Sequence, residues 1–330
     1  MKRKANREKQ NSAAVVVANQ DAQIVATVER LADAAKGFML DAAAGNTKRA
    51  YSSDWRHFGA FCQRLNLSPL PAAAETVALY LTELAERGLK TSTIGRHVAA
   101  INAAHKAAGL ESPAALPVVA STWRGIRRRL GARQAGKAPV LVADVLKMVN
   151  ATPADSLRGL RDRAILLVGF AGAFRRSELC NLDASDVQFT ERGALVTLRK
   201  SKTDQEGAGR LVAIPNGCPV AALRVWLDAS GIVEGRLFRG IDHNTGAMLA
   251  TLDGRSVNLI VKRAARAAGL EAANLGAHSL RSGFVTSAAE AGASDFDIMA
   301  TTGHATRAMV DRYRRPVDAF KNNAAARLGL

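Results

Sequence analysis

Apolar residues between positions 46 and 130 recur at steps of three and four, which is the spacing of amphipathic helices. The clearest run begins after Asn46 or Thr47, either of which is a suitable helix cap. Glycines and prolines separate this run from the later ones. The pattern predicts four helices, near 47–65, 75–88, 91–109 and 121–130. Four short helices in one stretch predict a compact all-α domain.

The pattern changes after residue 140, where short runs rich in β-branched residues join the helical ones. These runs predict strands at 186–189, 194–199 and 210–214. The polar loop 201–209 predicts that the strands form an antiparallel hairpin or meander. Helical spacing predicts further helices at 142–149, 157–173, 220–227, 256–267, 278–291, 296–301 and 306–313. The predicted fold is therefore mainly α with a small antiparallel sheet, in the α+β class.

A break in the pattern separates the two halves. Residues 131–140 contain two glycines, a proline and two cations but few apolar side chains, which predicts a basic linker. Residues 1–45 are rich in Ala, Asn, Gln and charged residues, which predicts a flexible basic N-terminal segment. The predicted organisation is a segment 1–45, an all-α domain 46–130, a linker 131–140 and a mixed domain 141–330 with a C-terminal helix.

The charge of the chain indicates a polyanionic partner. Its formal net charge is +17, although 48% of its 330 residues are hydrophobic, so it is expected to fold rather than to be a disordered basic protein. Such an excess in a folded protein favours nucleic acid, because each neutralised phosphate releases counterions. The stretch 124–137 contains no acid, although a solvated helix face is the alternative reading. The expected DNA-contacting cations are Arg96, Arg124, Arg127, Arg128, Arg129, Arg133, Lys137 and Lys200.

Other classes of protein are disfavoured by what the sequence lacks. Its longest apolar runs are about half of what a bilayer crossing needs, and its N-terminus does not resemble a secretory signal. Cys62, Cys180 and Cys218 form no metal-ligand pattern and indicate reduced thiols in a cytoplasmic protein, associated with the nucleoid when it binds DNA. Motifs for nucleotide or metal binding are missing, so we expect no cofactor and no metal.

Four short segments carry residues suited to phosphate chemistry. They are Arg175 with Glu178, Lys202, His278 with Arg281, and His304 with Tyr313. Each alone has an ordinary structural reading: a cation at the end of an apolar helix with an acid three residues later, an exposed loop lysine, or a pair on a helix surface. Only their combination favours a functional site.

In this order the segments resemble the tyrosine recombinase (phage-integrase-type) family. The family pattern is an R-x-x-E-L helix, a lysine on a β-hairpin, H-x-L-R, G-H, and a tyrosine nine residues after that histidine, as Tyr313 follows His304. Residues 86–105 also resemble the core-binding domain of simple two-domain members such as the Cre and Xer recombinases. The resemblance covers about residues 46–325 and implies a C-shaped clamp around DNA, with the all-α domain as core-binding domain and residues 141–330 as catalytic domain.

The resemblance implies a site-specific recombinase that cleaves and rejoins DNA through a covalent 3′-phosphotyrosyl intermediate, without ATP or metal. Tyr313 is then the nucleophile, His278 assists removal of its proton, and Lys202 protonates the departing 5′ oxygen. His304 holds the phosphate or positions Tyr313.

Two arginines complete the implied site. Arg175 and Arg281 suit a phosphate clamp, because the planar guanidinium is always charged and can bind two oxygens at once. The resemblance assigns Glu178 a supporting role, in which its carboxylate orients the side chain of Arg175 or that of His278.

The implied partners are a double-stranded DNA core site with inverted repeats and further copies of the chain, in a tetrameric synapse joined through the segment after Pro316. Packing of that segment on its own domain is the alternative. The biological role is expected to be integration, excision, or resolution of cointegrates or dimers. Two alternative functions remain open: a type IB topoisomerase-like enzyme that nicks and reseals DNA, and a DNA-binding relative without catalysis.

Overall fold

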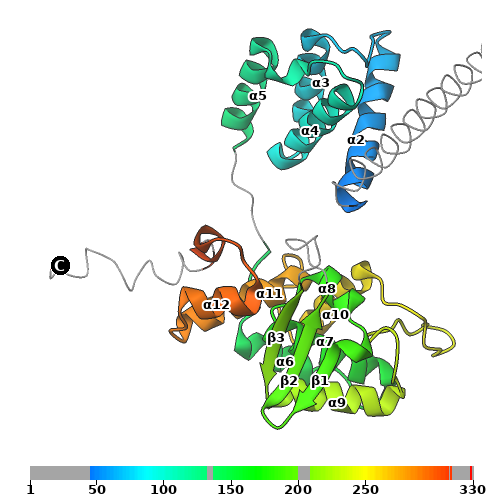
Figure 1. Cartoon of the computed structure of the whole chain (residues 1–330), viewed down its shortest axis with the longest axis vertical. Coiled ribbons are helices and arrows are strands. Elements are labelled where there is room, and N and C mark those ends of the chain that lie inside the picture. The colour runs from blue at the N-terminus through cyan, green and yellow to red at the C-terminus, as the bar shows by residue number, and fades with distance from the viewer. Residues whose placement is uncertain (1–44, 132–136, 200–208, 312, 314–327, 329–330) are drawn as a thin grey trace, which may run out of the picture. The chain divides into compact units, whose positions relative to one another are not determined.

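The computed structural model describes residues 45–131, 137–199, 209–311, 313 and 328, and the chain divides into two compact units, 1–134 and 135–330 (Figure 1). Several sequence predictions lie outside the described residues. They concern the N-terminal segment, Arg133, Lys200, Lys202 and the segment after Pro316.

The N-terminal unit is helical, as predicted. Its helices are α2 (Gly45–Arg64), α3 (Ala74–Glu86), α4 (Thr91–Ala107) and α5 (Pro117–Leu130), with a 3-10 turn, η1 (Pro113–Ala115), before α5. Helix α5 begins four residues earlier than predicted. Pro117 supplies its first turn, because the fixed φ of proline suits that position and its missing N–H would have no partner there.

A buried polar network joins three helices of this unit. The Tyr80 hydroxyl lies 3.0 Å from Nδ1 of His97, and Oδ1 of Asp54 lies 3.4 Å from Nε2 of the same ring. Arg96 gives Asp54 two hydrogen bonds, of 2.6 and 3.0 Å. Burial lowers the pKa of His97. The network fixes α2, α3 and α4 around an apolar core that includes the fully buried Phe58.

The C-terminal unit contains the predicted sheet. Its strands are β1 (Val187–Thr190), β2 (Gly193–Leu198) and β3 (Arg210–Pro215), in the order β1-β2-β3 with both pairs antiparallel. Val196 of β2 is paired with Val187 on one side and Val212 on the other, which gives a meander. The strands alternate buried and exposed side chains, so one face of the sheet contributes to the core and the other remains exposed.

The rest of the described part of this unit consists mainly of helices. They are α6 (Val142–Asn150), α7 (Leu157–Ala171), α8 (Arg176–Asn181), α9 (Cys218–Ser230), α10 (Gly254–Ala267), α11 (Ala277–Glu290) and α12 (Asp295–Thr302), with a 3-10 turn, η2 (Ala184–Asp186), before β1. Residues 307–311 and 313 are also helical. None of the helices within the described ranges is long and apolar enough to cross a membrane.

The ordinary alternative reading of Arg175, as a cation at the end of the apolar helix 157–173, is wrong. Helix α7 ends at Ala171, and Ala173 then takes a left-handed conformation with φ 47°. This turn directs Phe174 into the core and makes Arg175 the N-cap residue of a separate helix, α8. Apolar periodicity cannot show such a break. Phe174 would be buried in a helix that continued past Ala171, and it is also buried after the turn that ends α7.

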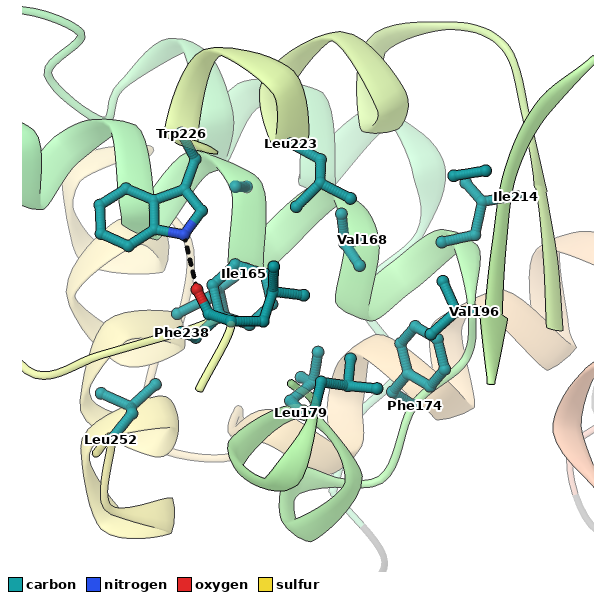
Figure 2. Close-up of a cluster of buried hydrophobic side chains, with 14 of the residues drawn as sticks. Ile165, Val168, Phe174, Leu179, Val196, Ile214, Leu223, Trp226, Phe238 and Leu252 are labelled. Atoms are coloured by element: carbon teal, nitrogen blue, oxygen red, sulfur yellow. Dashed lines mark hydrogen bonds between the residues drawn. The ribbon is translucent and has the colours of Figure 1, made fainter. Parts of the chain in front are cut away.

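The largest core cluster lies between α7, α9 and the sheet (Figure 2). Trp226 of α9 is fully buried, and its indole N–H donates a 2.8 Å hydrogen bond to the carbonyl of Leu237. Ile165 and Val168 of α7 pack in the same cluster, as do Val196 and Ile214 of the sheet. This packing holds the turn between α7 and α8, and with it Arg175, against the sheet.

We predict that Trp226→Ala lowers the free energy of unfolding by about 3–5 kcal/mol, because it leaves a large cavity. Trp226→Phe should lower it by about 1–3 kcal/mol, since the buried carbonyl of Leu237 is left without its donor. Denaturant unfolding followed by circular dichroism measures both. Val233→Ala, at a side chain that is 87% exposed, is the control and should have an effect within about 0.5 kcal/mol. Wild-type stability of Trp226→Ala would contradict this account of the core.

Candidate active site

Arg281 is the most deeply buried cation of the site. It lies on α11, is 2% exposed, and donates from Nη1 to the carbonyl of Ala173 at 2.6 Å and from Nη2 to that of Thr302 at 2.7 Å. These bonds join the turn before α8 to the end of α12. Burial, followed by the nearby charge of Arg175, lowers the pKa of Arg281 to about 10. The side chain therefore remains a cation at neutral pH, in surroundings that favour a bound anion.

Arg175 and Glu178 form an ion pair at the start of α8. The Glu178 carboxylate is almost fully buried and accepts the Arg175 backbone N–H at 2.8 Å and its Nη1 at 2.7 Å. Both carboxylate oxygens are thus used on one residue. Glu178 fixes the orientation of Arg175, as a carboxylate within a capping box does, and leaves the rest of the guanidinium for other partners.

Tyr313 lies between two histidines of the same chain. Its hydroxyl is 3.0 Å from Nε2 of His278, an exposed residue in the first turn of α11. Its ring stacks on that of His304, with ring centres 6.2 Å apart and an angle of 21° between the planes. The hydroxyl is therefore within reach of a base in its own chain.

His304 directly follows Gly303, the left-handed residue that ends α12. Its Nδ1 lies 2.9 Å from the Thr302 hydroxyl, which donates its one hydrogen to the carbonyl of Ile298. The ring therefore carries its hydrogen on Nδ1 and donates to that hydroxyl oxygen. Burial, with the charge of Arg281 next, lowers the pKa of His304 to about 4, so the ring is neutral at pH 7.

The structure brings together most of the residues that the sequence singled out for catalysis. Those in the described part of the chain are Arg175, Glu178, His278, Arg281, His304 and Tyr313, and they are linked by the contacts above. Lys202 lies outside the described residues. Within those residues, no group of three or more His, Cys, Asp or Glu side chains is placed to hold a metal ion. The three cysteines are free.

Sequence reasoning missed one cation that borders this group. Arg210, the first residue of β3, donates from Nη1 to the carbonyls of Ala300 and Thr301 at the end of α12. Its charge lowers the pKa values of Arg281 and His304. The sequence pattern showed only a strand that begins at 210. The available signal was the position of Arg210 in the sequence, at the start of a predicted strand and directly after the polar stretch 201–209.

The predicted DNA-contacting cations have different surroundings. The four arginines of α5 are exposed: Arg124, Arg127, Arg128 and Arg129. Arg96 is already paired with Asp54 and so has an anionic partner within the protein. Lys137 is exposed and donates to the carbonyl of Ala273 at 3.2 Å.

The fold is mainly helical, and its candidate site brings together arginines, histidines and a tyrosine, which are residue types suited to phosphate chemistry. Comparison with known proteins gives the family. The model of the phage integrase family matches residues 139–319. The integrase/recombinase xerD homolog of Selenomonas ruminantium is 39% identical over 308 residues, which cover 91% of this chain and 90% of that protein.

Two further comparisons agree. Tyrosine recombinase XerC of Corynebacterium efficiens is 31% identical over 289 residues, covering 83% of this chain and 84% of that protein. The crystal structure of a lambda integrase dimer bound to a COC′ core site has a TM-score of 0.56 and 20% identity, covering 82% of this chain and 89% of that one, which shows a shared fold. The chain belongs to the phage integrase family and is a tyrosine recombinase, an enzyme that cleaves and rejoins DNA. The family and the fold class expected from the sequence are confirmed.

We predict that protonation of His304 destabilises the DNA-free protein in acid. Between the ordinary histidine pKa of about 6.5 and the folded value of about 4, the unfolded chain binds more protons, so stability falls as the pH falls through this window. Urea unfolding measures how far the free energy of unfolding falls between pH 7 and pH 4.5. This decrease should be smaller by about 1–3 kcal/mol in His304→Asn than in wild type. The exposed His57→Asn is the control and should keep the wild-type loss. An equal loss in all three proteins would contradict the neutral, buried state of His304.

Proposed function

We propose that this recombinase exchanges strands between two copies of a specific DNA site, with Tyr313 as the nucleophile that forms a 3′-phosphotyrosyl bond. The observation that carries the proposal is the tyrosine hydroxyl 3.0 Å from Nε2 of His278, in a group of residues that includes two arginines. A free tyrosine is a poor nucleophile at neutral pH because its ordinary pKa is near 10. The imidazole of His278 accepts its proton as the hydroxyl attacks phosphorus.

Arg175 and Arg281 bind the scissile phosphate. In the reaction the bond between Tyr313 Oη and phosphorus forms while the bond from phosphorus to the 5′ oxygen breaks, and negative charge builds on the non-bridging oxygens. Two guanidinium groups, one oriented by Glu178 and one by backbone carbonyls, stabilise that charge. The departing 5′ oxygen takes a proton, a role that the family resemblance gives to Lys202.

His304 is proposed to bind the phosphate by a hydrogen bond from its ring. Its Nδ1–H is held by Thr302, so its neutral ring has no hydrogen on Nε2. A bound phosphate adds negative charge close to the ring and raises its pKa, which favours the doubly protonated form. In that form Nε2 donates to a phosphate oxygen, while the ring still stacks on Tyr313.

The covalent intermediate makes an external energy source unnecessary. One phosphodiester is exchanged for a phosphotyrosyl ester, so the 5′ hydroxyl of a second strand can attack phosphorus and release Tyr313 without ATP. Attack by the original 5′ hydroxyl reseals the first strand instead. No step of this scheme requires a metal.

The proposed partner is duplex DNA with inverted repeats, and both the core-binding domain and the catalytic domain are proposed to bind it. The exposed arginines of α5 bind phosphates without reading the bases. The lambda integrase structure above holds a dimer on a core site. For this chain we propose two copies on each site, four in the synapse, and a cytoplasmic enzyme that resolves, integrates or excises DNA.

We predict that Tyr313→Phe abolishes both the covalent adduct and strand exchange, because it removes only the attacking oxygen. DNA recovered by selection of bound sequences from a genomic pool provides the substrate. Denaturing gels detect the adduct, and plasmids with two copies of the recovered site report exchange. Tyr51→Phe, on α2, is the matched control and should keep wild-type activity. Adduct formation by Tyr313→Phe would refute the assignment, and relaxation of plasmids that lack the site, without exchange, would favour a topoisomerase.

We predict that the triple replacement of Arg124, Arg127 and Arg128 by Gln weakens DNA binding uniformly across sequences. The slope of log affinity against log salt concentration should become shallower by about 0.9 for each phosphate that the protein no longer neutralises. Fluorescence anisotropy between low and moderate salt measures the slope. Arg192→Gln, which removes an exposed cation from the turn between β1 and β2, should leave it unchanged. An unchanged slope in the triple variant would exclude α5 from the phosphate-binding surface.

A further inference from the structure

Arg210 has a hydrogen-bond donor that the fold does not use. Its Nη1 is bonded to the carbonyls of Ala300 and Thr301, but its Nη2 is buried and has no hydrogen-bond partner within the described part of the protein. Buried guanidinium nitrogens are normally satisfied, because the loss of water without a replacement is costly. An unsatisfied donor in an active site indicates a partner that arrives with the substrate.

The charges around Arg210 identify the chemistry of that partner. Besides burial, the charge of Arg175 lowers the pKa values of Arg210 and Arg281, and the Glu178 carboxylate raises both. The charge of Arg210 also lowers the pKa of Arg281. In the DNA-free protein His304 adds no charge at neutral pH, since its pKa is lowered to about 4. The three arginines and Glu178 therefore have a net charge of two positive units. A phosphodiester carries one negative charge, and a second develops as a nucleophile adds to phosphorus.

Arg210 is also in direct contact with the turn that carries His304. Gly303 has φ +64°, and a Cβ atom at this glycine would lie 2.9 Å from Nε of Arg210. The last carbonyls of α12 are divided between two arginines: Arg210 binds those of Ala300 and Thr301, and Arg281 binds that of Thr302. The guanidinium of Arg210 therefore lies against the residue that immediately precedes His304, where the substrate phosphate is proposed to bind.

We propose that Arg210 is a further phosphate-binding residue, whose Nη2 donates to a non-bridging oxygen of the scissile phosphate while its Nη1 holds the end of α12. This inference rests on the proposed function. Arginine suits both tasks, because its planar fork directs separate N–H groups to separate acceptors. A lysine would supply charge from one nitrogen but could not bind the α12 carbonyls and the phosphate in the same fixed geometry.

The test compares Arg210→Gln and Arg210→Lys with wild type in single-turnover formation of the covalent adduct. The DNA is the site recovered by selection, prepared once with an ordinary scissile phosphodiester and once with a neutral methylphosphonate at that position. Arg163→Gln is the matched control, because Arg163 also donates from Nη1 to two backbone carbonyls, those of Val149 and Thr152, near the end of α6. DNA affinity and circular dichroism are measured for every variant.

On the phosphodiester we expect Arg210→Gln to slow the adduct by about 10²–10³-fold with little change in DNA affinity, as expected when one donor to a developing oxyanion is removed. Arg210→Lys should recover part of the rate, and Arg163→Gln should react like wild type. On the methylphosphonate the defect of Arg210→Gln should shrink to less than about tenfold, because a neutral phosphoryl group needs less positive charge.

Three results would overturn the inference. A wild-type rate in Arg210→Gln would show that the residue has no role, and an equal defect on both DNAs would show that it acts only by holding α12. If Arg210→Gln does not fold, a full wild-type rate in Arg210→Lys would show that the branched guanidinium group of Arg210 is not needed for the reaction.

Inorganic phosphate provides an assay that does not depend on catalysis. Millimolar phosphate should raise the thermal stability of the wild-type protein and of Arg163→Gln. The apparent affinity for phosphate, obtained from this rise, should be at least about threefold weaker in Arg210→Gln. Equal stabilisation of all three would count against the inference. If the wild-type enzyme forms no adduct, the proposed function fails, and this phosphate assay alone decides the role of Arg210.

Discussion

The active site depends on how the C-terminal end of α12 is held. Arg210 from β3 and Arg281 from α11 bind the last carbonyls of this helix, which carry its partial negative charge. His304 follows directly, and Tyr313 stacks on its ring. Through these two cations, the sheet, α11 and the turn before α8 position His304 and Tyr313, the proposed nucleophile. The same cations are the groups that a phosphate would contact, so the geometry of the nucleophile and the binding of substrate are physically coupled.

This arrangement costs stability in the absence of DNA. Burial lowers the pKa values of Arg210 and Arg281, which shows that their charged forms are less favourable here than in water. Glu178 offsets part of the repulsion and is itself fixed by Arg175. The apolar cluster around Trp226 supports the turn that carries Arg175. A well-packed core next to these charged residues thus holds them in the arrangement that the proposed dianionic transition state requires.

The sequence predicted the helices and the three-strand meander because their apolar periods were clear, and the ordered segments from Arg175 to Tyr313 indicated the site. It could not show that Arg175 begins its own helix, because the left-handed Ala173 leaves no apolar signature. Arg210 was missed since its importance comes from hydrogen bonds to α12, ninety positions away in the chain. Likewise, the neutral state of His304 follows from burial and from a shared hydroxyl, which exist only after folding.

The proposed reaction requires that the Tyr313 hydroxyl attacks a phosphodiester and retains the 3′ phosphate. Mass spectrometry of the trapped and digested protein–DNA adduct tests it most directly, since it identifies both the modified residue and the DNA end. We expect a nucleotide 3′-phosphate esterified to Tyr313 and a free 5′ hydroxyl on the other fragment. Attachment to another residue, or a 5′-phosphate linkage with a free 3′ hydroxyl, would contradict it.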